Sequence, residues 1–308
     1  MERILVTGGA GFIGSHLVDL LLATEKASVL VFDNFRLGKR EHLEGALSTG
    51  RLTVLEGDIR SADDLRQVAD FEPDTVFHLA ALHFVPYCKA HPQEAVDVNV
   101  LGLDTVIRAL RPAPLRRFVF ASSAAVYEFG DERWRETSPA RPGDIYGISK
   151  WMGEHFVAQL HADRPEVRTA VNRLFNVYGP RETNPHVLPD IMAAIREGRK
   201  LELGNLWPQR DFTYVADTAR ALVTTASGDG FDVFNVGTGT GTTVGDVLAT
   251  IETIRGEPLD IWEDPARQRP GDGHLVGDPR KLMAATGWRP EYDLKAGIRA
   301  LLASEGLL

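Results

Sequence analysis

The sequence predicts an α/β fold built on a doubly wound parallel sheet, and three observations carry this prediction. Short apolar runs alternate with helical patterns along the first half of the chain. The first apolar run ends in a glycine-rich turn that leads directly into a helical pattern, and the second ends in an aspartate. Strands and helices in strict alternation imply a parallel sheet with crossover helices on both of its faces.

The glycine-rich turn is the strongest local signal. Residues 7–14 read TGGAGFIG, in which Gly9, Gly11 and Gly14 have the spacing of a dinucleotide-binding turn. Glycine lets the backbone approach a phosphate closely, and the free N–H groups of a helix N-terminus attract its negative charge. The helix that follows has a broad apolar face, formed by Phe12, Ile13, Leu17, Val18, Leu20, Leu21 and Leu22.

An acidic residue follows at the distance that such a turn requires. The apolar run 29–32 ends at Asp33, which lies 19 residues after Gly14. A carboxylate at this place accepts hydrogen bonds from the adenosine ribose. It would also repel a 2′-phosphate, which favours NAD over NADP. Arg36, Lys39 and Arg40 follow closely and would offset part of that preference.

The rest of the chain continues the alternation and then changes character. We expect strands at 51–55, 75–79, 117–121 and 169–174, and helices at 62–69, 94–110 and 146–160. After about residue 178, prolines interrupt shorter elements, which indicates a smaller substrate-binding lobe. Because the apolar run 231–236 reads as a strand returning to the main sheet, we expect this C-terminal lobe to be interleaved. The expected Rossmann-type domain comprises 1–178 and 206–260, and the lobe comprises 179–205 and 261–308.

Composition limits the class of protein. The 308 residues are 44% apolar and 25% charged, as in an ordinary globular protein, and the formal net charge of −9 argues against nucleic-acid binding. Cys88 is the lone cysteine, so no intrachain disulfide forms and we expect a cytoplasmic protein. We expect no secretory leader and no membrane span, because no run of 18 apolar residues exists. The histidines at 78, 83 and 91 match no metal-ligand spacing, so no metal is expected.

A candidate catalytic group lies near the middle of the chain. Tyr146 and Lys150 are four residues apart, which places them on one face of a helix. A tyrosine acts as a base only if its pKa, ordinarily about 10, is lowered, and a nearby ammonium or an oxidised nicotinamide ring would lower it. Ser122 and Ser123 follow the apolar run 118–121. Ser123 would therefore lie where it can hydrogen-bond a reacting oxygen beside Tyr146.

Taken together, these motifs resemble the extended short-chain dehydrogenase/reductase family, in its branch of nucleotide-sugar epimerases and dehydratases such as the UDP-glucose 4-epimerases. The matching segments occur in order between residues 3 and 290: 7–14, 33–34, 57–59, 78–81, Asn99, 122–123, 146–150, 173–181, 210–217 and 269–272. The resemblance implies an NAD cofactor, a nucleotide-diphosphate sugar as substrate, and a homodimer formed through the helices near 94–110 and 146–160.

The resemblance also implies a role for individual residues. The catalytic residues would be Ser123, Tyr146 and Lys150. The cofactor would contact Gly8, Gly11, Phe12, Ile13, Gly14, Asp33, Asn34, Asp58, Ile59, Leu79, Ala80, Ala81 and Asn99, together with Tyr146 and Lys150. The substrate would contact Ser123, Asn176, Val187, Leu188, Arg210 and Arg269, in which the two arginines neutralise the diphosphate.

The two positions after Ser123 separate the possible reactions. In the similar 4,6-dehydratases an Asp-Glu pair stands there, and those acids transfer the protons of the elimination. This chain has Ala124 and Ala125, whose methyl groups transfer no proton, so the sequence favours a 4-epimerase working through a transient 4-keto sugar. Segments 85–88 and 204–212 are similar to those of certain amino-sugar dehydratases, which keeps a 4,6- or 5,6-dehydratase as the alternative. A 4-keto-sugar reductase and a non-catalytic dinucleotide sensor are less favoured.

Overall fold

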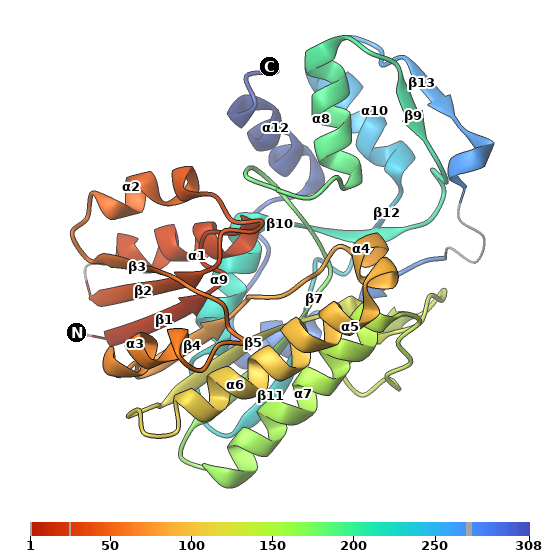
Figure 1. Ribbon diagram of the computed structural model, residues 1–308. Coiled ribbons are helices and arrows are strands. Elements are labelled where there is room, and N and C mark those ends of the chain that lie inside the picture. Colours follow the sequence, from red (N-terminus) through yellow and green to blue (C-terminus); the bar gives the residue numbers. More distant parts are fainter. Residues whose placement is uncertain (1, 25, 269–272) are drawn as a thin grey trace.

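The computed structural model describes residues 2–24, 26–268 and 273–308, and it has a seven-stranded parallel sheet at its centre (Figure 1). The strands are β1 (Glu2–Thr7), β2 (Ala27–Asp33), β3 (Leu52–Glu56), β4 (Thr75–His78), β5 (Arg117–Ser123), β7 (Arg168–Leu174) and β11 (Phe231–Val236). Their order is β11-β7-β5-β4-β1-β2-β3. From the neighbours β1 and β4, the chain adds β2 and β3 towards one edge of the sheet and β5, β7 and β11 towards the other. The boundary between β1 and β4 is therefore the switch point of a doubly wound fold, and the predicted fold class is confirmed.

Helices cover both faces of this sheet (Figure 1). On one face, α1 (Phe12–Ala23), α9 (Val215–Thr225) and α11 (Arg280–Thr286) share a buried core with Ile4 and Val6 of β1. On the other face, α3 (Asp64–Asp70), α6 (Gly102–Ala109) and α7 (Ile145–Asp163) pack in a second core around Leu5. Adjacent β1 residues thus belong to opposite cores, as the two-residue period of a strand requires.

The helix expected at 94–110 is present but interrupted. It consists of α5 (Pro92–Val96), a π-helical turn at Asp97–Leu101, and α6, and it follows the short helix α4 (Val85–Ala90). Asn99 lies in the π-helical turn, where its side chain accepts a hydrogen bond from Leu82 N at 2.7 Å and donates to Leu82 O at 2.8 Å. It also donates to Ser149 Oγ at 2.9 Å. The interruption therefore ties the loop after β4 to α7.

The remaining elements form the smaller lobe and short connections. The lobe contains α8 (Val187–Glu197), β9 (Leu201–Leu203), β13 (Ile261–Glu263) and α12 (Leu294–Ser304). Beside it lie β8 (Asn176–Tyr178), β10 (Arg210–Tyr214), β12 (Gly241–Thr242) and α10 (Val244–Arg255), which belong to the ranges expected for the Rossmann-type domain. The connections include α2 (Glu44–Leu47), β6 (Arg133–Trp134) paired with β14 (Val276–Gly277), and 3-10 turns at Arg40–Leu43, Ala124–Val126 and Pro265–Arg267. A third core, with Ile191, Phe212 and Leu301, joins α8, β10 and α12.

The lobe is interleaved with the sheet, as the run 231–236 predicted. β11 pairs in parallel with β7, with Phe234 opposite Asn172, after the chain has already built α8, β9 and β10. Asp211 of β10 holds the loop that follows β11 by hydrogen bonds. Its fully buried carboxylate accepts hydrogen bonds from Thr238 N and Thr238 Oγ1, both at 2.7 Å, from Gly239 N at 2.9 Å and from Gly277 N at 3.2 Å. Within the described part of the chain, no helix has the length and apolarity to cross a membrane.

Candidate active site

A cavity of about 1540 Å³ lies at the carboxyl ends of the parallel strands. The loops after β1, β2, β4 and β5 form one side of it, and β8, α8 and β10 form the other. Ligands of doubly wound sheets bind at this edge, beside the switch point. The cavity is lined by Gly8, Gly11, Phe12, Ile13, Gly14, Asp33, Asn34, Asp58, Ile59, Leu79, Ala80, Ala81, Ser123, Tyr146, Lys150, Asn176, Val187, Leu188 and Arg210.

Among the described site residues that the sequence predicts, Asn99 is not on its wall. Asn99 is 2% exposed and lies behind the wall, where it holds Leu82 rather than facing the cavity. Arg269 lies outside the described residues. Asn99 therefore positions the loop that carries Leu79, Ala80 and Ala81, which do line the cavity.

The glycine turn between β1 and α1 forms a cradle of bare backbone. Gly8 has a φ of 72°, and a Cβ on Gly14 would lie 2.2 Å from Gly8 O. Gly11 is the N-cap of α1, and the described residues supply no side-chain cap there. Free N–H groups and the positive end of the helix dipole therefore face the cavity, which fits the pyrophosphate of a dinucleotide.

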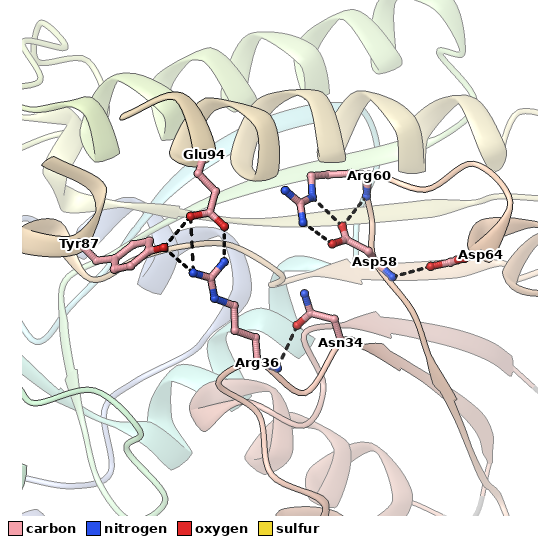
Figure 2. Close-up of polar contacts among 7 residues, drawn as sticks. All are labelled: Asn34, Arg36, Asp58, Arg60, Asp64, Tyr87 and Glu94. Carbon is pink, nitrogen blue, oxygen red and sulfur yellow. Dashed lines mark hydrogen bonds and ion pairs between the residues drawn. The ribbon is translucent and has the colours of Figure 1, made fainter. Parts of the chain in front are cut away.

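The ends of β2 and β3 close one end of the cavity, where the sequence predicts the adenosine of the dinucleotide (the adenosine end). Asp33 accepts hydrogen bonds from Ala10 N at 3.0 Å and Phe35 N at 2.9 Å, and burial raises the pKa of this carboxyl. Asp58 follows β3 and is paired with Arg60, whose hydrogen bonds are the main reason that the pKa of Asp58 is lowered (Figure 2). Asn34 also hydrogen-bonds Asp58, so the two loops are joined across this end.

Tyr146, Lys150 and Ser123 converge at the other end of the same wall. Tyr146 and Lys150 lie in the first turns of α7, whose N-cap Asp144 accepts a hydrogen bond from Gly147 N at 2.9 Å. Lys150 is 4% exposed, and its Nζ donates to Ala121 O of β5 at 2.8 Å. Ser123 ends β5, hydrogen-bonds Tyr146, and accepts from Ala125 N at 3.1 Å.

The protein alone does not make Tyr146 a base. Burial raises its pKa to about 12, and the hydrogen bond with Ser123 acts in the opposite direction. Burial also lowers the pKa of Lys150 to about 8. Sequence reasoning expected the lysine to lower the tyrosine pKa, but here the loss of solvation outweighs its neighbours. The positive charge of an oxidised nicotinamide ring, if one is bound here, would favour the phenolate.

The substrate side of the cavity is built from β8, α8 and β10. Asn176 is the exposed first residue of β8, and Val187 and Leu188 begin α8, for which the described residues again supply no side-chain cap. Arg210 begins β10, where it donates to Gly273 O and its guanidinium lies 4.8 Å from the centre of the Phe129 ring. A helix N-terminus and an arginine on one wall fit an anionic group such as a diphosphate.

Sequence reasoning missed a polar cluster in the same cavity. Glu182 accepts hydrogen bonds from Thr183 N and Asn184 N and lies 3.4 Å from His186 Nδ1. Asn184 Nδ2 lies 2.7 Å from His83 Nε2, which joins this loop to the loop after β4. Burial lowers the pKa of His83. No local spacing signals this cluster, because folding alone brings residues 83 and 182 together.

Fold and site together define a dinucleotide-dependent enzyme of the short-chain dehydrogenase/reductase type, and comparison with known proteins agrees. Residues 5–301 match the family described as GDP-mannose 4,6 dehydratase. The chain is 33% identical to the UDP-glucose 4-epimerase of Rhizobium leguminosarum bv. trifolii, over 97% of this chain and 96% of that protein. It is 27% identical to the dTDP-D-glucose 4,6-dehydratase of Mus musculus, over 97% and 87%.

A solved structure is equally similar. The UDP-glucose 4-epimerase of Thermus thermophilus in complex with NAD has a TM-score of 0.87, 33% identity, and 99% coverage of both chains. The chain belongs to the GDP-mannose 4,6 dehydratase family, within the NAD-dependent nucleotide-sugar epimerases and dehydratases. The predicted NAD cofactor is confirmed at this level.

Proposed function

We propose that this protein is an NAD-dependent nucleotide-sugar 4-epimerase. The observation that carries the proposal is the grouping of Ser123, Tyr146 and Lys150 on a wall whose next residues are Ala124 and Ala125. Both alanines line the cavity in the 3-10 turn after β5, so no proton-transferring side chain stands there. The epimerase relatives support the same reaction.

Each residue of the group has a distinct task in this reaction. A bound NAD would supply reversible hydride chemistry at the sugar C4. Tyr146 accepts the proton of the 4-hydroxyl as a phenolate, and Ser123 hydrogen-bonds the same oxygen. The Lys150 ammonium favours the phenolate and is held in place by Ala121 O. A turn of the keto sugar about its diphosphate would then present the opposite face of C4 to the same dinucleotide site.

The diphosphate is the pivot of that turn. Asn176 would contact the sugar nucleotide, the N-terminus of α8 at Val187 and Leu188 would face its phosphates, and Arg210 would neutralise them. Arg269 is proposed for the same role on the resemblance alone. In this proposal residues 1–178 and 206–260 form the NAD-binding domain, and 179–205 with 261–308 form the nucleotide-sugar-binding lobe.

The reaction is tested by incubating the purified protein with a panel of UDP-, dTDP- and GDP-hexoses. Mass spectrometry after chromatography should show a new sugar nucleotide of unchanged mass and no net consumption of NADH. Tyr146→Phe should lower the rate by about 10²–10⁴-fold, because general base catalysis is lost, while bound NAD is retained. A product lighter by one water, or near-normal turnover of Tyr146→Phe, contradicts the proposal.

The second candidate is a dehydratase, and one observation favours it. Ala124 and Ala125 offer no titratable group, but Glu182 and His186 line the same cavity and do offer one each. If the protein eliminates water, Glu182→Gln should abolish the 4-keto product. If it epimerises, Glu182→Gln should leave turnover within a few-fold of the unaltered protein.

We also propose a homodimer formed through the helices near 94–110 and 146–160. Leu101, next to α6, and Ile148, Trp151 and Met152 of α7 are apolar side chains exposed by 38–52%. Light scattering coupled to size-exclusion chromatography should give twice the chain mass, and a monomer would exclude this arrangement. A cytoplasmic location stays a prediction from the lone Cys88.

A further inference from the structure

The adenosine end of the cavity is lined by two arginines, and both are paired with carboxylates of the protein (Figure 2). Arg36 comes from the loop after β2, three residues beyond Asp33, and Arg60 comes from the loop after β3. An arginine beside the ribose site can accommodate the 2′-phosphate of NADP, because its guanidinium matches phosphate geometry. The pairing of the two arginines here therefore bears on which dinucleotide the cavity accepts.

Arg36 is held from two helices at once. Its two terminal nitrogens contact both oxygens of Glu94 on α5, and Nη2 also donates to Tyr87 Oη on α4. Tyr87 Oη donates in turn to Glu94 Oε2 at 2.6 Å, and the Arg36 guanidinium carbon lies 5.1 Å from the centre of the Tyr87 ring. Figure 2 shows the arginine reaching away from its own loop to this pair. Its charge and its terminal donors are thus used within the protein.

Arg60 is held by its neighbour in the same loop. Its Nε donates to Asp58 Oδ1 at 2.9 Å and its Nη2 to Asp58 Oδ2 at 2.5 Å, which is a bidentate pair. Asp58 is itself a proposed cofactor contact, so this pairing is part of the cofactor site. The Glu94 and Tyr87 pair is different, because neither residue lines the cavity.

We propose that Glu94 and Tyr87 are specificity-determining residues, which restrict the enzyme to NAD by keeping Arg36 from the 2′ position of the adenosine ribose. A 2′-phosphate would gain Arg36 only if the contacts with Glu94 and Tyr87 were broken. It would meet the Asp33 carboxylate as well, so two charged interactions oppose NADP. The proposal concerns the cofactor alone and is independent of the sugar chemistry.

The test is a competition between the two dinucleotides. Purified Glu94→Gln/Tyr87→Phe protein is incubated with equal concentrations of NAD and NADP, and native mass spectrometry measures the bound ratio. Freed Arg36 should raise the NADP-to-NAD ratio roughly tenfold, as one charge-assisted hydrogen bond would. Adding Arg36→Ala to the same protein should return the ratio to its original value. An unchanged ratio in the first variant, or a rise that persists without Arg36, overturns the proposal.

Two further variants make the result specific. Glu56→Gln removes the same charge from a salt bridge with Arg40 in the neighbouring chain segment, but neither residue lines the cavity. It should leave the ratio unchanged, and a tenfold rise in this control would show a general charge effect and overturn the proposal. Glu94→Gln alone should give a smaller rise in the same direction, so the proposal is tested even if the double variant is unstable.

Discussion

Lys150 is a charged side chain that the fold buries at a cost in solvation free energy. The residue is 4% exposed, and its ammonium donates to Ala121 O and lies 5.0 Å from the centre of the Phe120 ring. Burial lowers its pKa to about 8. This buried charge destabilises the fold, and in the proposed reaction it would favour the Tyr146 phenolate. Functional sites commonly carry such a cost.

We therefore expect Lys150→Met to stabilise the cofactor-free protein near neutral pH while removing activity. The free energy of unfolding should rise by roughly 1–2 kcal/mol, because the variant no longer buries a charge, and this outweighs the loss of one hydrogen bond. Below pH 8 the lysine is protonated in both states and the full difference is present. Between pH 8 and 10.5 the folded protein releases the proton first, so the advantage of the variant declines. Urea unfolding across this range measures it. The exposed Lys295→Met serves as control, and a variant less stable at pH 7 contradicts the argument.

At the scale of elements, close packing at the start of α7 places the proposed catalytic residues. A Cβ on Gly147 would lie 2.2 Å from Ala125 O and 3.0 Å from Pro142 Cβ. The first turn of α7 therefore touches the 3-10 turn Ala124–Val126 through bare backbone. Tyr146 precedes this contact directly and Lys150 follows it one turn later, so their position relative to Ser123 depends on it.

Gly147→Ala should displace this turn. We expect a loss of about 1–3 kcal/mol in the free energy of unfolding, because the added methyl group meets backbone that cannot yield. The turnover number should fall further than the stability loss explains. Gly143→Ala is the matched control, since a Cβ there meets nothing within 4 Å. Thermal melts and kcat of both variants decide the matter, and equal behaviour of the two would show that this contact does not place Tyr146.

Local sequence patterns predicted most strands and helices of the main sheet, because each of them depends on a short stretch of residues. The strand expected at 51–55 is Leu52–Glu56, and the strand expected at 169–174 is Arg168–Leu174. The π-helical turn at Asp97–Leu101 was not predictable, since the hydrogen bonds of Asn99 to Leu82 come from a distant loop. The same holds for Glu182 beside His83 and for Arg36 held by Glu94. These parts of the site depend on tertiary contacts between distant residues, which the spacing of residues in the sequence does not reveal.

On the scale of the whole molecule, Asp211 joins β10 to the loop that follows β11, the strand that returns to the sheet. Its two oxygens accept four hydrogen bonds from Thr238, Gly239 and Gly277. These partners follow β11 and end β14, whereas Asp211 lies in β10. A buried acceptor with four donors and no solvent is sensitive to any replacement that brings a donor of its own.

Asp211→Asn should lower the free energy of unfolding by about 2–4 kcal/mol, because the amide nitrogen must face N–H groups. Since β10 also carries Arg210, binding of a nucleotide sugar should weaken together with stability. Chemical denaturation and calorimetric titration with UDP-glucose measure the two effects. Asp229→Asn, on the exposed turn before β11, should change neither property. A variant as stable as the unaltered protein would rule out this fastening role.

The late arrival of β11 also sets the order in which a ribosome can complete this protein. Until residue 236 has emerged, the buried strand β7 is an open sheet edge with unpaired N–H and C=O groups. During synthesis, α8, β9 and β10 therefore emerge while the edge of β7 is still without its partner strand β11. Chains released in this interval would expose a strand ready to associate with others.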